Sequence, residues 1–242
     1  MPAVAPAAVP DSAPDTAPDL AQYLAPARYV DSDHPAVIDF ARSQANESMA
    51  ARDIAVKLYY AVRDQFRYDP YNLDVSEHGL KASTVLATGR GFCIPKAVLM
   101  AAAARVLGVP ARLGYADVRN HLTSPKLHEM MGSDLFVFHG YAEMWIASRW
   151  VKATPSFNRT LCDKAGILPL EFDGRNDSIF HPFDSVGRRH MEYVKQRGHF
   201  ADLPRDALLA AFREQYPTFS RWGPQGTASD FESDVEQNAR GG

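Results

Sequence analysis

The chain has 242 residues, of which 46% are hydrophobic and 23% are charged, and its formal net charge is −3. This length and composition suit one sizeable globular domain or two small ones with a true hydrophobic core. The sequence has no block of basic residues, which disfavours a nucleic-acid partner. No apolar run approaches the roughly 20 residues that a membrane-spanning helix needs, so we expect no membrane partner either.

The two ends of the chain differ in composition from the centre. Residues 1–22 are rich in proline and alanine, a composition that predicts a disordered N-terminal tail. Residues 223–242 are polar and glycine-rich, which predicts a flexible C-terminal tail. Neither a repeat nor a shift in composition divides residues 23–222, so we expect them to form a single domain.

Cysteine usage and the N-terminus together predict the compartment. The first 18 residues lack the basic start of a signal peptide. The chain has only two cysteines, Cys93 and Cys162. We therefore expect a cytoplasmic protein without a structural disulfide.

Helical spacing of apolar residues predicts a helical N-terminal part followed by strands. Expected helices begin near residues 35, 48 and 83, and a fourth, apolar on nearly every face, covers 93–107. Expected strands cover residues 111–118, 135–146 and 149–153, the last two joined by a turn at 147–148. Residues 119–134 and 156–190 are predicted as loop segments, and an amphipathic helix is expected over 204–216.

The segment Gly91-Phe92-Cys93 places a cysteine after a glycine turn and directly before the apolar helix. Pro95 fits the first helical turn, where a missing N–H is tolerated. Cys93 is thus expected at the positive end of a buried helix dipole, close to free backbone N–H groups. Such surroundings lower a thiol pKa and stabilise an oxyanion, so we predict that Cys93 is a nucleophile.

The hairpin predicted over 137–154 places a histidine on a defined face. Its turn at 147–148 pairs Glu143 with Lys152, Trp145 with Trp150 and Tyr141 with Thr154. Because side chains alternate along a strand, His139, Tyr141, Glu143, Lys152 and Thr154 are expected on one face. If that face packs against the start of the Cys93 helix, His139 is the base for the thiol.

Two groups of motifs resemble those of the transglutaminase-like (papain-like cysteine) superfamily. The first is Gly91-Phe92-Cys93 with the apolar helix and Gly108-Val109-Pro110-Ala111-Arg112. The second is His139-Gly140-Tyr141-Ala142-Glu143, then Trp150-Val151 and Thr154-Pro155. The resemblance covers roughly residues 50–160, and residues 160–220 look like those of a bacterial subgroup. It implies an α+β fold with a central Cys-bearing helix packed on an antiparallel sheet, and a Cys–His–Asp site.

The sequence departs from the family pattern at the third catalytic position, where Thr154 stands in place of aspartate. A threonine hydroxyl can orient an imidazole, but it cannot carry the charge that stabilises an imidazolium. Asn158 is an alternative partner, in the role that asparagine has in papain-like enzymes. Tyr141 is another candidate to hold the ring, whereas Glu143 is on the right face but is expected to pair with Lys152.

The resemblance implies a cysteine enzyme that acts on an amide or peptide bond through a Cys93 thioester, with water or an amine as acceptor. We expect a peptide or small amide substrate and no cofactor. No His-Glu-x-x-His or paired-cysteine spacing predicts a metal site. Because of Thr154, two alternatives stay open. One keeps the fold but changes the chemistry, through lyase-type proton transfer or with a metal. The other is a non-catalytic binding module.

Overall fold

The computed structural model describes residues 19–120, 124–179, 191–219 and 230–241. Residues 1–18 of the predicted N-terminal tail lie outside this range. Its last residues enter a short 3₁₀ helix, η1 (Leu20–Tyr23), and the Tyr23 ring packs edge-on against Trp150 at a centroid distance of 5.0 Å. Residues 20–22 of the predicted tail therefore belong to a short helix.

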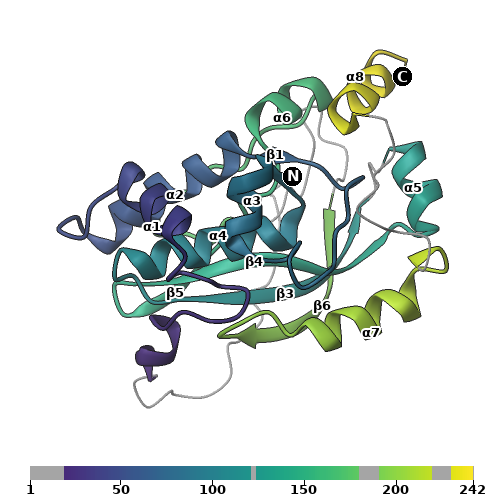
Figure 1. Ribbon diagram of the computed structural model, residues 1–242. Coiled ribbons are helices and arrows are strands. Elements are labelled where there is room, and N and C mark those ends of the chain that lie inside the picture. The colour runs from purple at the N-terminus through teal and green to yellow at the C-terminus, as the bar shows by residue number, and fades with distance from the viewer. Residues whose placement is uncertain (1–18, 121–123, 180–190, 220–229, 242) are drawn as a thin grey trace, which may run out of the picture.

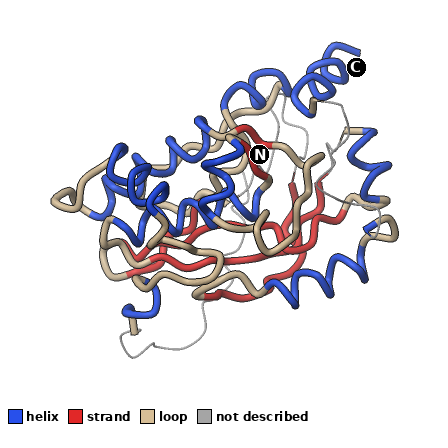
Figure 2. The backbone as a smooth tube through the Cα atoms, in the orientation of Figure 1, coloured by secondary structure: helices blue, strands red, loops and turns tan. Residues whose placement is uncertain are grey.

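A four-stranded antiparallel sheet and a central helix organise the fold. The strands are β3 (Ala111–Asn120), β4 (Leu135–Ile146), β5 (Arg149–Ala153) and β6 (Met191–Phe200), in the order β5-β4-β3-β6. Helix α4 (Cys93–Val106) lies on one face of the sheet. Helices α1 (Pro35–Gln44), α2 (Ala51–Gln65) and α3 (Ala82–Thr88) cover α4, as Figures 1 and 2 show. The expected α+β fold, with a Cys-bearing helix packed on an antiparallel sheet, is confirmed.

Shorter elements surround one end of this two-layer core. Strands β1 (Arg67–Tyr68) and β2 (Arg90–Gly91) pair in parallel just before α4. Helix α5 (Pro125–Met131) follows β3, and α7 (Arg205–Gln215) follows β6 and packs on β4. Helices α6 (Arg159–Ala165) and α8 (Phe231–Gly241) pack against each other (Figure 1).

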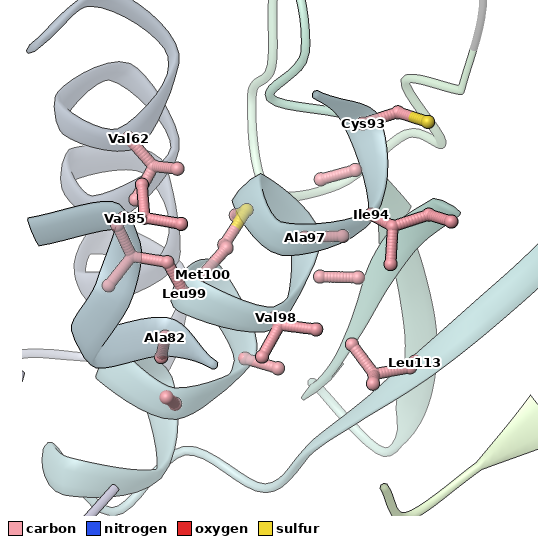
Figure 3. Packing of buried hydrophobic residues seen from close by; sticks show 14 of the residues in the cluster. Val62, Ala82, Val85, Cys93, Ile94, Ala97, Val98, Leu99, Met100 and Leu113 are labelled. Carbon is pink, nitrogen blue, oxygen red and sulfur yellow. The ribbon is translucent and has the colours of Figure 1, made fainter. Parts of the chain in front are cut away.

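Helix α4 is buried on every side, as its composition predicts. All residues from 93 to 105 are buried. Figure 3 shows its aliphatic side chains between α2 and α3 on one side and β3 on the other. The run of four alanines, 101–104, lets neighbouring elements approach the helix backbone closely, so α4 forms the centre of the core.

The predicted hairpin register is confirmed. Glu143 pairs with Lys152 and Trp145 with Trp150, and the two tryptophan rings lie 5.2 Å apart. Ala147 and Ser148 turn the chain with φ of 49° and 63°, the left-handed values that a two-residue hairpin turn needs. The ladder ends at Ala153, one residue short of the expected Tyr141–Thr154 pair.

The predicted sheet face is wrong for three of its members: Tyr141, Glu143 and Lys152, which pairs with Glu143. Gly140 lies directly against the start of α4, because a Cβ there would meet the Ile94 Cα at 3.1 Å. Ala142 and Met144, two and four residues on, belong to the core around α4. Strand alternation therefore turns Tyr141 and Glu143 to the opposite face of the sheet.

Several predicted loops contain regular structure. The loop over 119–134 includes α5, the segment 156–190 includes α6, and the tail from 223 includes α8. Strand β6 was not expected at all. Among the described residues, every helix is too short or too polar to cross a lipid bilayer.

Candidate active site

Cys93 occupies the first position of α4, as predicted. Phe92 is the N-cap in an extended conformation, and Pro95 lies within the first turn. The Cys93 side chain is buried, and Figure 3 shows its sulfur at the start of the helix, pointing away from Val62 and Val85. The thiol thus lies at the positive end of the helix dipole.

The thiol pKa differs from the expectation. Burial raises the pKa of Cys93 to about 11, and this effect outweighs the opposing backbone N–H groups of Gly140, Ile94 and Cys93. The free energy needed to remove the thiolate from water is larger than the stabilisation that these N–H groups provide. The prediction of a lowered pKa is therefore wrong for the unliganded protein, in which the thiol is protonated.

His139 lines the same cavity as Cys93. It lies on β4 opposite Ala116, next to a distortion where Phe138 has φ of 57° and the β3–β4 register shifts. The next residue, Gly140, directs its N–H at the Cys93 sulfur. The predicted proximity of the thiol to the His139 segment is therefore present.

The His139 imidazole is neutral in the folded protein. It is 4% exposed, and burial lowers its pKa to about 4. Its Nε2 has no hydrogen-bond partner within the described ranges. A buried, unpartnered imidazole nitrogen on a residue that lines the same cavity as the thiol is available to accept a proton.

This burial predicts a pH-dependent stability. Between pH 4 and about 6.5 the unfolded chain binds a proton at His139 that the folded chain does not, so stability is lost as pH falls through this window. The full effect is about 3 kcal/mol at 1.36 kcal/mol per pKa unit. Urea unfolding at pH 7 and pH 4.5 measures it.

The His139→Gln variant is expected to lose this part of the pH dependence. The exposed His128 provides the matched control, and His128→Gln keeps the wild-type slope. Equal slopes in wild type and His139→Gln would contradict a buried neutral imidazole.

Thr154 follows the last residue of β5 and is 3% exposed. Its N–H donates to the Ser178 carbonyl at 2.8 Å, and its carbonyl accepts from the Tyr59 hydroxyl at 3.4 Å. Its Oγ1 is buried without a partner in the part of the chain that is described. The backbone of Thr154 is thus fixed, while its hydroxyl is unused.

Tyr141 and Glu143 make their contacts on the face away from α4. The Tyr141 hydroxyl accepts a hydrogen bond of 2.6 Å from the Gln196 amide on β6. Glu143 is fully buried, and its two oxygens lie 2.5 Å from Arg112 Nε and 3.0 Å from His199 Nδ1. The prediction of an ion pair between Glu143 and Lys152 is wrong. Arg112 lies directly opposite Glu143 on β3 and is its ionic partner instead of Lys152.

Asn158 belongs to a different contact network. Its Oδ1 accepts from the Tyr68 N–H at 2.9 Å, and its Nδ2 donates to Glu232 at 2.8 Å and to Thr160 at 2.6 Å. These bonds hold β1 against α6 and α8. The predicted alternative of a papain-like role for Asn158 has no support in these contacts.

Sequence analysis missed Lys96, one turn into α4. It is fully buried, and its Nζ donates to the carbonyls of Arg63, Phe66 and Ser156 at 2.9, 2.6 and 2.8 Å. Burial lowers its pKa to about 7. Lys96 ties the end of α2 and the segment after Thr154 to the start of α4. A lysine in the first turn of a helix that is otherwise apolar up to Ala104 was the available signal.

The carboxylates of the 156–190 segment serve structural contacts where they are described. Asp173 accepts from the N–H groups of Arg175 and Asn176, and Asp177 accepts from the N–H of Lys152. Asp184 and His121 lie outside the described residues. Within those residues, no group of three or more His, Cys, Asp or Glu side chains is placed to hold a metal ion.

Comparison with known proteins agrees with the motifs. The sequence profile described as transglutaminase-like superfamily matches residues 38–155, which include Cys93, His139 and Thr154. A crystal structure of a proposed cysteine protease from Cytophaga hutchinsonii is similar with a TM-score of 0.44 and 17% identity. The alignment covers 75% of this chain and 54% of that one, so this chain spans about half of its length. No curated protein matches the sequence.

Proposed function

Because the chain belongs to the transglutaminase-like superfamily through residues 38–155, we propose that it is a cysteine-dependent enzyme that acts on an amide or peptide bond. The thiol of Cys93 attacks the carbonyl carbon, and the acyl group passes through a thioester to water or an amine. One observation carries the proposal: Cys93, at the start of buried helix α4, shares a cavity with the neutral imidazole of His139.

The first half-reaction starts from a neutral pair. Burial raises the thiol pKa and lowers the imidazole pKa, so an ion pair is not formed in advance. His139 accepts the thiol proton as the sulfur–carbon bond forms. It then donates that proton to the leaving amine as the carbon–nitrogen bond breaks. Backbone N–H groups at the start of α4 stabilise the negative charge on the carbonyl oxygen.

In the second half-reaction His139 takes a proton from the incoming water or amine. The nucleophile adds to the thioester carbonyl, and the sulfur leaves with the proton returned by the imidazole. Hydrolysis and transfer to an amine use the same residues and differ only in which acceptor reaches the thioester.

We propose that Thr154 orients His139, because it stands at the third catalytic position of the family pattern and its buried hydroxyl has no partner among the described residues. Thr154→Val keeps the shape of the side chain and removes the hydroxyl. We expect kcat to fall about fivefold, since one neutral hydrogen bond contributes about 1 kcal/mol. Thr154→Ser restores the hydroxyl and should restore most of the rate. Equal kcat values for the wild type and the valine variant would remove Thr154 from the site.

A trapped thioester tests the proposed function. The protein is mixed with an activated acyl donor, quenched in acid and analysed by intact and peptide mass spectrometry. One acyl group mapped to Cys93 is expected. Absence of an adduct, together with a stoichiometric bound metal, would favour the metal-assisted alternative. Absence of both would favour a non-catalytic binding module.

A further inference from the structure

The cavity at Cys93 has an almost entirely apolar wall. Its volume is about 40 Å³. Side chains from five parts of the fold enclose it: the segment after β1, the start of α4, α5, β4 and α7. Leu73, Leu127, Met131 and Phe212 are typical of this lining. Helix α5, in the segment predicted as a loop over the site, closes one side.

Within the described residues, no charged side chain lines this cavity. Besides Cys93 and His139, the only polar side chains among the described lining residues are Tyr68 and Tyr216. The Tyr216 hydroxyl is already bonded to the Val137 N–H at 2.8 Å and to the Leu135 carbonyl at 3.2 Å. A carboxamide or charged side chain that enters this cavity gives up its hydrogen bonds with water and finds almost no replacement. An aliphatic side chain has no such hydrogen bonds to give up.

The apolar character is specific to this side of the catalytic turn. Phe92 also borders a second cavity of about 160 Å³, which is lined by polar side chains that include Asp69, Asn72 and Arg90. The two sides of the Gly91-Phe92-Cys93 turn therefore differ in charge: charged side chains line the second cavity, and none of the described residues that line the first is charged. Of these two cavities, the one next to the thiol and His139 is the better match for an apolar group of the substrate.

We propose that the Cys93 cavity is the subsite for the acyl donor's side chain, and that it selects a medium-sized aliphatic side chain such as that of methionine or leucine. This inference rests on the proposed function, because it takes the Cys93 thioester as given. The small volume disfavours bulky rings, and the apolar wall disfavours glutamine, glutamate and lysine.

Matched donors test the selection. Methionine and glutamine side chains are close in size and differ mainly in polarity. Two activated peptide thioesters are prepared that differ only in this acyl-donor residue. The rate of acylation of Cys93 is followed by mass spectrometry, and kcat/KM is measured by release of the thiol. We expect kcat/KM to be 10- to 100-fold higher for the methionine donor.

A variant of the wall provides an independent readout. Met131→Gln places an amide in the lining at nearly constant volume, and it should reduce the methionine-to-glutamine ratio at least threefold. Leu168→Gln, at a side chain that is 65% exposed, is the control and should keep the wild-type ratio. If Met131→Gln does not fold, the wild-type ratio decides the question alone.

The outcomes separate this inference from the proposed function. If no donor acylates Cys93, the proposed function fails, and this inference fails with it. If both donors acylate Cys93 and the glutamine donor is equal or faster, the proposed function stands and the aliphatic subsite is overturned.

Discussion

Replacing Cys93 with alanine is expected to abolish turnover and the acyl adduct while the fold is kept. The Cys93 thiol forms the covalent intermediate in the proposed mechanism, so the loss in kcat should reach about three orders of magnitude or more. The substitution removes one buried sulfur at the first position of α4, where alanine suits a helix. The free energy of unfolding should therefore change by only about 1 kcal/mol.

Cys162 offers a matched control. It is also fully buried, but it lies on α6, and its sulfur is 3.9 Å from the Phe157 carbonyl. Cys162→Ala is expected to keep wild-type turnover and to label as the wild type does at Cys93. Turnover measurements and circular dichroism of both variants complete the test. Full turnover in Cys93→Ala would refute the proposed mechanism.

The largest effect on stability is expected at Lys96. Lys96→Met keeps the aliphatic volume but removes all three donors, and it leaves the carbonyls of Arg63, Phe66 and Ser156 without this bond. Each unsatisfied buried group costs about 1–3 kcal/mol. The free energy of unfolding should therefore fall by about 3 kcal/mol or more, a large share of the 5–15 kcal/mol typical of a domain.

The control for Lys96 is Lys57→Met on the solvent side of α2, which should change the stability by less than about 0.5 kcal/mol. Urea unfolding measures both variants. Because Lys96 also links α4 to the segment after Thr154, a folded Lys96→Met protein should show a lowered kcat. A stability equal to that of the wild type would mean that solvent or other groups satisfy the three carbonyls.

Features that depend on neighbours in sequence were predictable. The apolar run 93–107 became the buried helix α4, and the two-residue turn at 147–148 set the pairing of β4 with β5. Strand alternation and helix periodicity are local rules, so a short stretch of sequence is enough to apply them. Placing Cys93 at the start of α4 needed nothing more than the glycine turn and Pro95.

Features that depend on distant partners were not predictable. Strand β6 is half-exposed and polar and lies at the sheet edge, and only its pairing with β3 makes it a strand. Glu143 faces Lys152 as predicted, yet it binds Arg112 and His199 from two other strands. Helix α8 looked like a polar tail, but Phe231 packs against the rings of Tyr68 and Tyr71. In each case a contact distant in sequence overrides the local pattern.

For Cys93, too, some properties follow from the sequence and others only from the tertiary structure. Its residue type, its place before an apolar helix and the histidine on a later strand are properties of the sequence, and they suffice to propose the nucleophile and its base. The protonation state of both groups was decided by the tertiary structure. Burial under α5, α7 and β4 removes water from the thiol and the imidazole. The effect of this desolvation on the thiol pKa is larger than that of the helix dipole, which was the only one of the two effects that could be predicted from the sequence.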